Sequence, residues 1–206
     1  NSGMLLEQDA SQVAETGGAE HAIVELLRLG LGQRHEFGDG LGGDAGIYGE
    51  HVGRTADHGD RSEILHRIVG QIRAAWPEVK IILRGDSGFC RDELMSWCED
   101  KGVEFVFGMA RNQRLRKIIG GQLHEATQQW KQTGKPARVF SEFEYQTRKR
   151  KKGGGWKRAR RVVAKAEHIE GKENPRFVVT SLSSQRGTAK LLYEELYCIR
   201  GDMENR

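Results

Sequence analysis

The sequence predicts an α/β protein in which a β-rich block interrupts the alternation of helices and strands. From residue 61 to residue 107, amphipathic helical patterns alternate with short apolar runs, which is typical of α/β folds. Between residues 139 and 167, apolar and polar residues alternate on either side of three consecutive glycines, as in a β-hairpin. The strand and helix patterns resume at residue 176.

The chain is expected to have three parts. Residues 61–110 and 176–206 form the α/β core, and residues 111–175 form an inserted β-rich subdomain with a basic hairpin. Residues 1–60 are an atypical acidic segment with 13 of the 27 glycines and eleven acidic residues against three arginines and no lysine. Such a composition favours disorder, although an apolar pattern predicts one helix over residues 19–29.

The elements follow from local patterns. An apolar stripe predicts a helix over residues 62–75, which ends at Trp76-Pro77 because the residue before proline disfavours helical geometry. The further predicted elements are strand 79–83, helix 91–101, strand 103–107, two helical pieces within 111–135 broken at Gly120-Gly121, strands 139–147, 161–167 and 176–180, and a helix from residue 188 to the end.

Strand 79–83 runs into the turn Arg-Gly-Asp-Ser-Gly-Phe, which places Asp86 at the carboxyl end of the strand. In open α/β sheets, ligands and metals are held at this end. Asp86 therefore has two possible roles. One is to cap the turn or the helix after it, and the other is to bind a metal ion.

Near the end of the sequence, Tyr197, Arg200 and Glu204 share one face of the predicted helix. At α-helical spacing, Arg200 lies about 60° and Glu204 about 20° around the axis from Tyr197. A carboxylate can hold a metal ion while a guanidinium binds phosphate oxygens. The alternative is a surface ion-pair pattern, which does not explain Gly201, at a cost of about 1 kcal/mol inside a helix.

Positive charge is concentrated in residues 145–166, which hold ten lysines and arginines in total and no acidic residue. Neutralisation of backbone phosphates by such a stretch gives salt-sensitive binding to nucleic acid. The alternatives are a solvated surface hairpin and a localisation signal. The predicted DNA contacts are Arg148, Lys149, Arg150, Lys151, Lys152, Trp156, Lys157, Arg158, Arg160 and Arg161.

Together these motifs resemble those of bacterial insertion-sequence transposases of the DDE type. Tyr197, Arg200 and Glu204 match the family signature Tyr-x2-Arg-x3-Glu-x6-Lys, and the Asp86 turn is similar to the family's second catalytic aspartate. The resemblance covers roughly residues 61–206 and includes the strings FVFGMARN, RRVVAKAEH, NPRFVVTSL and LYEELYCIRGDMENR. It implies an RNase H-like core with a β-rich insertion between the second aspartate and the glutamate.

The resemblance also implies roles for individual residues. Asp86 and Glu204 would be the second and third metal-binding carboxylates, and Tyr197 and Arg200 would position the end of a DNA strand. Three carboxylates holding Mg²⁺ or Mn²⁺ support phosphodiester cleavage and strand transfer. The implied partners are the terminal inverted repeats of an insertion sequence and a second copy of the chain in synapsis.

No membrane contact is expected, and the protein is predicted to be cytoplasmic and nucleoid-associated. No apolar run approaches the length of a membrane span, and the three cysteines lack the spacing of a metal site. Three free thiols are typical of a reducing compartment.

Three departures from the family pattern change the expectation. No strand bearing the family's first aspartate is recognised in residues 1–60, residues 1–53 do not show the family pattern, and the expected Lys or Arg falls after Arg206. We therefore expect a truncated copy whose first part is out of the ancestral reading frame, with an incomplete core and no activity. The alternatives are a non-catalytic DNA-binding remnant and a nuclease that recruits Asp57 or Asp60.

Overall fold

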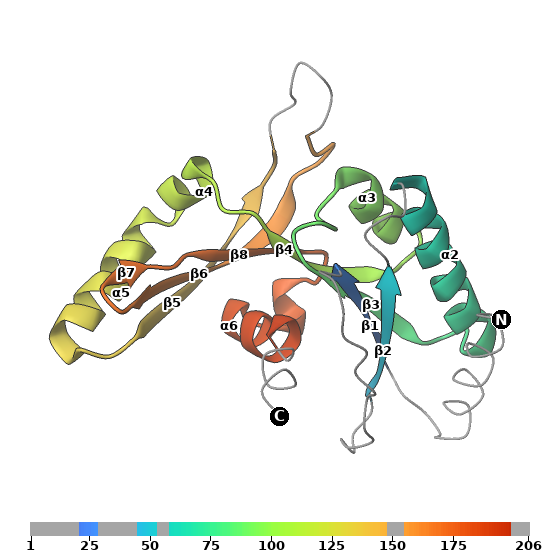
Figure 1. Ribbon diagram of the computed structural model, residues 1–206, viewed down its shortest axis with the longest axis horizontal. Coiled ribbons are helices and arrows are strands. Elements are labelled where there is room, and N and C mark those ends of the chain that lie inside the picture. The colour runs from blue at the N-terminus through green and yellow to red at the C-terminus, as the bar shows by residue number, and fades with distance from the viewer. Residues whose placement is uncertain (1–20, 29–44, 53–57, 148–154, 199–206) are drawn as a thin grey trace. The chain divides into compact units, whose positions relative to one another are not determined.

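The computed structural model describes residues 21–28, 45–52, 58–147 and 155–198, and their elements are shown in Figure 1. The chain divides into two compact units, residues 1–84 and residues 85–206. The α/β prediction is confirmed, because helices and strands occur in both units. None of the helices in the described residues has the length and apolar character needed to cross a bilayer.

The first unit contains two parallel strands and a long helix. Strand β1 (His21–Arg28) pairs with β2 (Ala45–Val52) over eight residue pairs, and β3 (Lys80–Gly85) begins in this unit. Helix α2 (His58–Ala75) buries an apolar stripe that includes Leu65, Ile68 and Ile72. The predicted helix 62–75 is therefore confirmed, with four more residues at its start.

The helix predicted over residues 19–29 is wrong, because the structure has strand β1 there. An apolar run of this length does not distinguish a short helix from a strand. The adjacent β-branched residues Ile23 and Val24 favour an extended backbone, and the parallel ladder with β2 supplies its hydrogen bonds. That ladder joins segments separated by 16 residues, a non-local pairing that local periodicity does not report.

The second unit is built on an antiparallel sheet in the order β4-β8-β6-β5, with β7 paired to the edge of β6. The predicted helices and strands between residues 91 and 180 are confirmed with small shifts of their ends. The elements are α3 (Asp92–Asp100), β4 (Glu104–Met109), α4 (Gln113–Ile118), α5 (Gly120–Thr133), β5 (Ala137–Tyr145), β6 (Arg160–Ile169), β7 (Lys172–Glu173), β8 (Arg176–Thr180), η1 (Ser184–Arg186), α6 (Ala189–Leu191) and η2 (Leu192–Tyr197).

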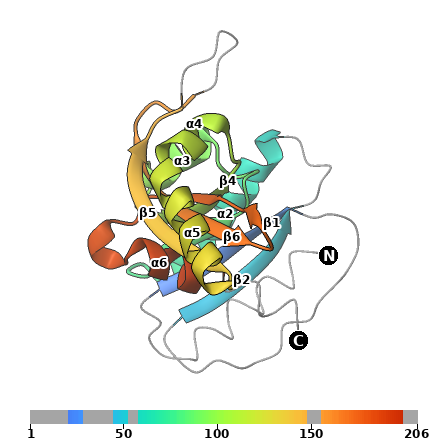
Figure 2. The same cartoon turned by 90° about the vertical axis from the view of Figure 1, so that its left-hand side faces the viewer.

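The two faces of this sheet carry different helices, as Figures 1 and 2 show. On one face, Trp130 of α5 packs against His168 of β6, with ring centroids 4.7 Å apart. On the other, Lys165 of β6 lies 5.2 Å from the ring of Tyr193 in η2. Because alternate residues of a strand point to opposite faces, odd and even positions of β6 serve different neighbours.

The strands predicted within the inserted block, β5 and β6, share one sheet with β4 and β8. Their antiparallel register runs from Ala137↔His168 to Tyr145↔Arg160, which confirms the predicted hairpin pairing. Of the three glycines expected at its tip, Gly153 and Gly154 lie outside the described residues. Separate folding of residues 111–175 as a subdomain stays a prediction.

The helix predicted from residue 188 differs in its winding. Thr188 caps the short helix α6 through its side chain, which accepts a hydrogen bond from Leu191 N. The next turn, η2, is π-helical, with Cys198 N donating to Tyr193 O at 3.0 Å. The α-helical spacing used for residues 197–204 therefore does not hold at its start, and residues 199–206 lie outside the described part.

Candidate active site

The Asp86 turn is fixed by short-range contacts. Asp86 Oδ1 accepts a hydrogen bond from Gly88 N at 2.7 Å, and the Asp86 carbonyl accepts one from Phe89 N at 3.1 Å. A Cβ on Gly85 would lie 2.9 Å from Phe89 Cδ2, so glycine is required beneath the Phe89 ring. The predicted turn-capping role of Asp86 is confirmed, and it uses Oδ1.

Asp86 and Tyr197 line the same pocket, which has a volume of about 630 Å³. The volume is typical of a small-ligand site. The turn after β3 contributes Asp86 and Ser87, the end of β4 contributes Gly108, and η2 contributes Tyr197. The fold thus brings together two predicted site residues that are 111 positions apart in the sequence.

The absence of a side chain at Gly108 leaves room for the Tyr197 hydroxyl group. A Cβ at position 108 would lie 3.3 Å from Tyr197 Cζ, closer still to the Tyr197 hydroxyl oxygen, and 3.2 Å from Ser87 N. Any larger residue at position 108 would push the ring out of this position. The sequence carried a signal for this, because glycine within a strand marks close approach of another group.

Two arginines of the same pocket, Arg111 and Arg176, were not predicted as site residues. Arg111 follows β4 by two residues, and Arg176 begins β8. In the antiparallel register Met109 pairs with Phe177, so both arginines lie at the same end of the two strands. The strand pattern predicted each strand end, but only the pairing places the two ends together.

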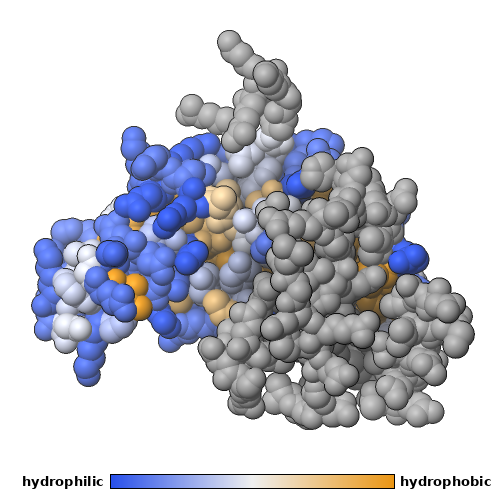
Figure 3. Space-filling model, viewed as in Figure 1, coloured by the Kyte–Doolittle hydropathy of each residue, from blue (hydrophilic) through white to orange (hydrophobic). Residues whose placement is uncertain are grey.

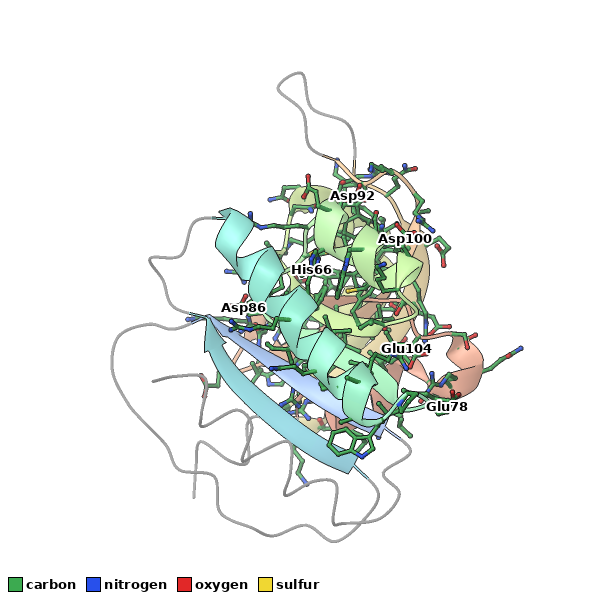
Figure 4. The ribbon with its side chains drawn as sticks, turned by 90° about the vertical axis from the view of Figure 1, so that its right-hand side faces the viewer. His66, Glu78, Asp86, Asp92, Asp100 and Glu104 are labelled. Carbon is green, nitrogen blue, oxygen red and sulfur yellow. The ribbon has the colours of Figure 1, made fainter. Side chains whose placement is uncertain are left out.

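The predicted basic stretch is divided by burial. Arg160 is 4% exposed and donates to Glu99 at 2.7 and 3.0 Å, to Asp92 at 2.8 Å and to Ser96 at 3.1 Å. Figure 4 labels Asp92 at the start of α3. Arg160 therefore fastens the start of β6 to helix α3.

Trp156 is also part of the fold, at 4% exposed. Its ring packs edge-on against Tyr145 at 5.8 Å, and its backbone N donates to Thr147 Oγ1 at 2.7 Å. Arg161 donates to Glu142 and to the carbonyls of Leu182 and Gly187, and so holds the segment before α6. The contact of these side chains with DNA stays a prediction.

Lys157 and Arg158 are exposed. Lys157 N donates to Asp92 Oδ1 at 3.0 Å. The Arg158 side chain is 55% exposed and lies 3.2 Å from Glu99. The remaining predicted contacts, namely Arg148, Lys149, Arg150, Lys151, Lys152, Arg200 and Glu204, lie outside the described residues.

The family of the chain follows from a comparison with family models. Residues 52–206, about three quarters of the chain, match the model described as transposase DDE domain group 1. The chain belongs to this transposase family. No curated protein matches the chain.

The match sharpens the sequence-based resemblance. That resemblance was drawn over roughly residues 61–206, and the match to the transposase domain begins at residue 52. Both Asp86 and Tyr197 lie within it. The transposase prediction is thus confirmed at the level of the family.

Proteins of this transposase family generally use a divalent metal ion, and carboxylates are suitable ligands for such an ion. Among the residues that the structure describes, no group of three or more His, Cys, Asp or Glu side chains is arranged to hold a metal ion. Asp86 is the acidic residue in the lining of the pocket. The described residues therefore do not make a complete two-metal site by themselves.

The pKa values of two groups that follow the Asp86 turn in the sequence, Cys90 and Asp92, are shifted by their surroundings. Burial alone would raise the pKa of Asp92, but hydrogen bonds from Arg160 and Lys157 N outweigh it and hold this pKa below its ordinary value. Burial raises the pKa of Cys90, close to the Asp86 turn, to about 12. Burial thus favours the neutral thiol form of Cys90.

Proposed function

We propose that this protein is a transposase for DNA transposition, by metal-dependent strand cleavage and strand transfer at the ends of a bacterial insertion sequence, and that the present chain is inactive. The observation that carries the proposal is the shared pocket of Asp86 and Tyr197 in a chain of the transposase DDE family. An Asp carboxylate suits a metal ion, and a phenol beside it suits the strand that is cut. Asp86 would be the second metal-binding carboxylate and Glu204 the third, with Mg²⁺ or Mn²⁺ as the metal.

We propose further that the core is RNase H-like and is incomplete in this chain. The family match begins at residue 52, and residues 1–51 lie outside it. The glycine-rich and lysine-free composition of the segment before residue 60 supports an origin in another reading frame. Translation of the upstream DNA in the other two frames tests this idea, and finding no transposase-like N-terminal half there contradicts it.

The proposed DNA contacts are the exposed cations of the basic stretch, Lys157 and Arg158 with residues 148–152, together with Tyr197 and Arg200. Arg158 supports this proposal because its side chain is 55% exposed and because it shares Glu99 with Arg160. Phosphate contacts of this kind give salt-sensitive and sequence-independent affinity. The terminal inverted repeats are the proposed target, with two copies of the chain joined in synapsis at the nucleoid.

A nicking and binding assay tests the proposal. The chain and a frame-restored chain are incubated with Mg²⁺ or Mn²⁺ and supercoiled DNA that carries the flanks of the gene. We expect both chains to bind DNA, and we expect only the restored chain to nick it. Asp86→Ala and Glu204→Ala should each abolish nicking.

The alternative functions give different outcomes of the same assay. Binding without nicking by either chain favours a non-catalytic DNA-binding remnant. Nicking by the present chain that is lost in Asp86→Ala favours a nuclease completed by Asp57 or Asp60. Nicking that survives Asp86→Ala, or no DNA binding by the restored chain, overturns the proposal.

A further inference from the structure

The pocket that holds Asp86 has an excess of positive charge. Arg111 and Arg176 line it from the ends of two paired strands, and Asp86 is the acidic residue in the lining. Both arginines are exposed. Figure 3 shows hydrophilic side chains over the region of α4, which begins two residues after Arg111.

These two arginines differ from the nearby Arg114 and Arg116 in that their side chains have no ion pair or hydrogen bond among the described residues. Arg116 of α4 pairs with Glu173 at 2.6 Å, and Arg114 lies over the Tyr145 ring at 4.9 Å while donating to the carbonyl of Gln146. In the part of the chain that the structure describes, the ion pairs include neither Arg111 nor Arg176. Among the described residues, no carboxylate therefore balances their charge at ion-pair distance.

Two guanidinium groups that lack an ion pair among the described residues can together bind the negative charge of a phosphodiester. Each guanidinium presents planar donors that fit the non-bridging oxygens of phosphate. The pocket volume of about 630 Å³ suits a small ligand or a short piece of strand and not a duplex. Tyr197, which is partly exposed in the lining, adds aromatic surface that suits a nucleotide.

We propose that Arg111 and Arg176 bind a backbone phosphate of a single DNA strand that enters the Asp86 pocket. This inference rests on the proposed function, because it gives the strand that would be cut its phosphate anchor. It also assigns a role to the Asp86 charge when no metal is bound. A bare carboxylate in the same pocket repels the phosphate and weakens strand binding.

The test measures binding of a fluorescein-labelled 12-nucleotide single strand to the full 206-residue chain in EDTA by fluorescence anisotropy. Arg111→Gln and Arg176→Gln should each lower the slope of log K against log salt by about 0.7, the value for one phosphate contact on a single strand. Arg116→Gln, whose charge is already paired with Glu173, is the matched control and should leave the slope unchanged. Asp86→Asn should tighten binding.

The outcomes separate this inference from the proposed function. If the chain binds the strand but Arg111→Gln and Arg176→Gln behave like Arg116→Gln, the phosphate anchor is wrong and the proposed function stands. If the chain binds neither single-stranded nor duplex DNA, both fail. Displacement of the strand by 10 mM inorganic phosphate as fully as by unlabelled strand would identify a site for free phosphate, and this result overturns the proposal. Circular dichroism spectra that match the unaltered chain confirm that each variant is folded.

Discussion

Replacement of Arg160 by methionine should destabilise the protein without weakening its contact with DNA. The Arg160 side chain is 2% exposed and meets Asp92 and Glu99, which are 10% and 17% exposed, at 2.7 to 3.0 Å. Methionine fills similar space but removes the buried cation that pairs with Asp92 and with Glu99, and of the two only Glu99 keeps another ion pair among the described residues, with Arg158. Loss of one partner from a buried ion pair costs about 3–5 kcal/mol in the free energy of unfolding.

Arg158→Met is the matched control. Arg158 lies two positions before Arg160 and contacts the same Glu99, at 3.2 Å, but its side chain is 55% exposed. An exposed ion pair contributes about 0–1 kcal/mol, so this variant should unfold at nearly the same urea concentration as the unaltered chain. Its loss should instead lower the salt dependence of duplex binding by about one phosphate contact.

Urea unfolding followed by circular dichroism measures the first effect, and anisotropy of a labelled duplex over a series of salt concentrations measures the second. We expect Arg160→Met to change the unfolding free energy alone and Arg158→Met to change the salt slope alone. Equal losses of stability in the two variants would refute the assignment of Arg160 to the fold. A fall in the salt slope with Arg160→Met that equals the fall with Arg158→Met would show that Arg160 also meets DNA.

Three further predictions concern the same unit. Gly108→Ala should lower the free energy of unfolding by about 1–3 kcal/mol, because the new Cβ overpacks against Tyr197. Gly121→Ala is the control, since nothing lies within 4 Å of its new Cβ, and it should be neutral or stabilising in the same urea measurement. Equal effects of the two substitutions contradict the close approach of Tyr197 to Gly108. Folding lowers the pKa of Asp92, so the stability that its carboxylate contributes is present above the unfolded pKa of about 4 and is lost as the pH falls through the lower folded pKa. The urea midpoint of the unaltered chain should therefore drop below about pH 4, and the midpoint of Arg160→Met should drop by less. An equal drop in both proteins argues against the ion pair of Asp92 with Arg160. Trp156→Ala should cost about 3–5 kcal/mol, read from thermal unfolding, and an unchanged melting temperature would place the indole at the surface.

The sequence predicted the second unit well because its elements have strong local signals. Asn112, which caps α4 through its side chain, and the left-handed Gly134 after α5 mark helix ends that pattern reading recognises. The alternating residues of β5 and the glycines after it predicted a hairpin, and the hairpin is present. Each of these features depends on neighbours within a few positions.

The candidate site was predicted only in part, because it depends on pairings between distant segments. Asp86 and Tyr197 were found from motifs, but the meeting of Arg111 and Arg176 follows from the register of β4 with β8. Burial was the other missing quantity. Nothing in the run from residue 148 to residue 161 distinguishes Arg160, whose partners lie on α3 more than 60 residues earlier, from the exposed Arg158.

The two-sided packing of β6 has a consequence for how this domain tolerates change. Even-numbered positions of the strand meet α3 and α5, through Arg160 and His168, while odd-numbered positions meet η2 and the segment before α6, through Lys165 and Arg161. In a saturation-mutagenesis experiment along this strand, both the type and the severity of the defect should therefore alternate from one position to the next. Substitutions at even positions should lower the stability of the whole fold, and substitutions at odd positions should change the position of η2, which carries Tyr197.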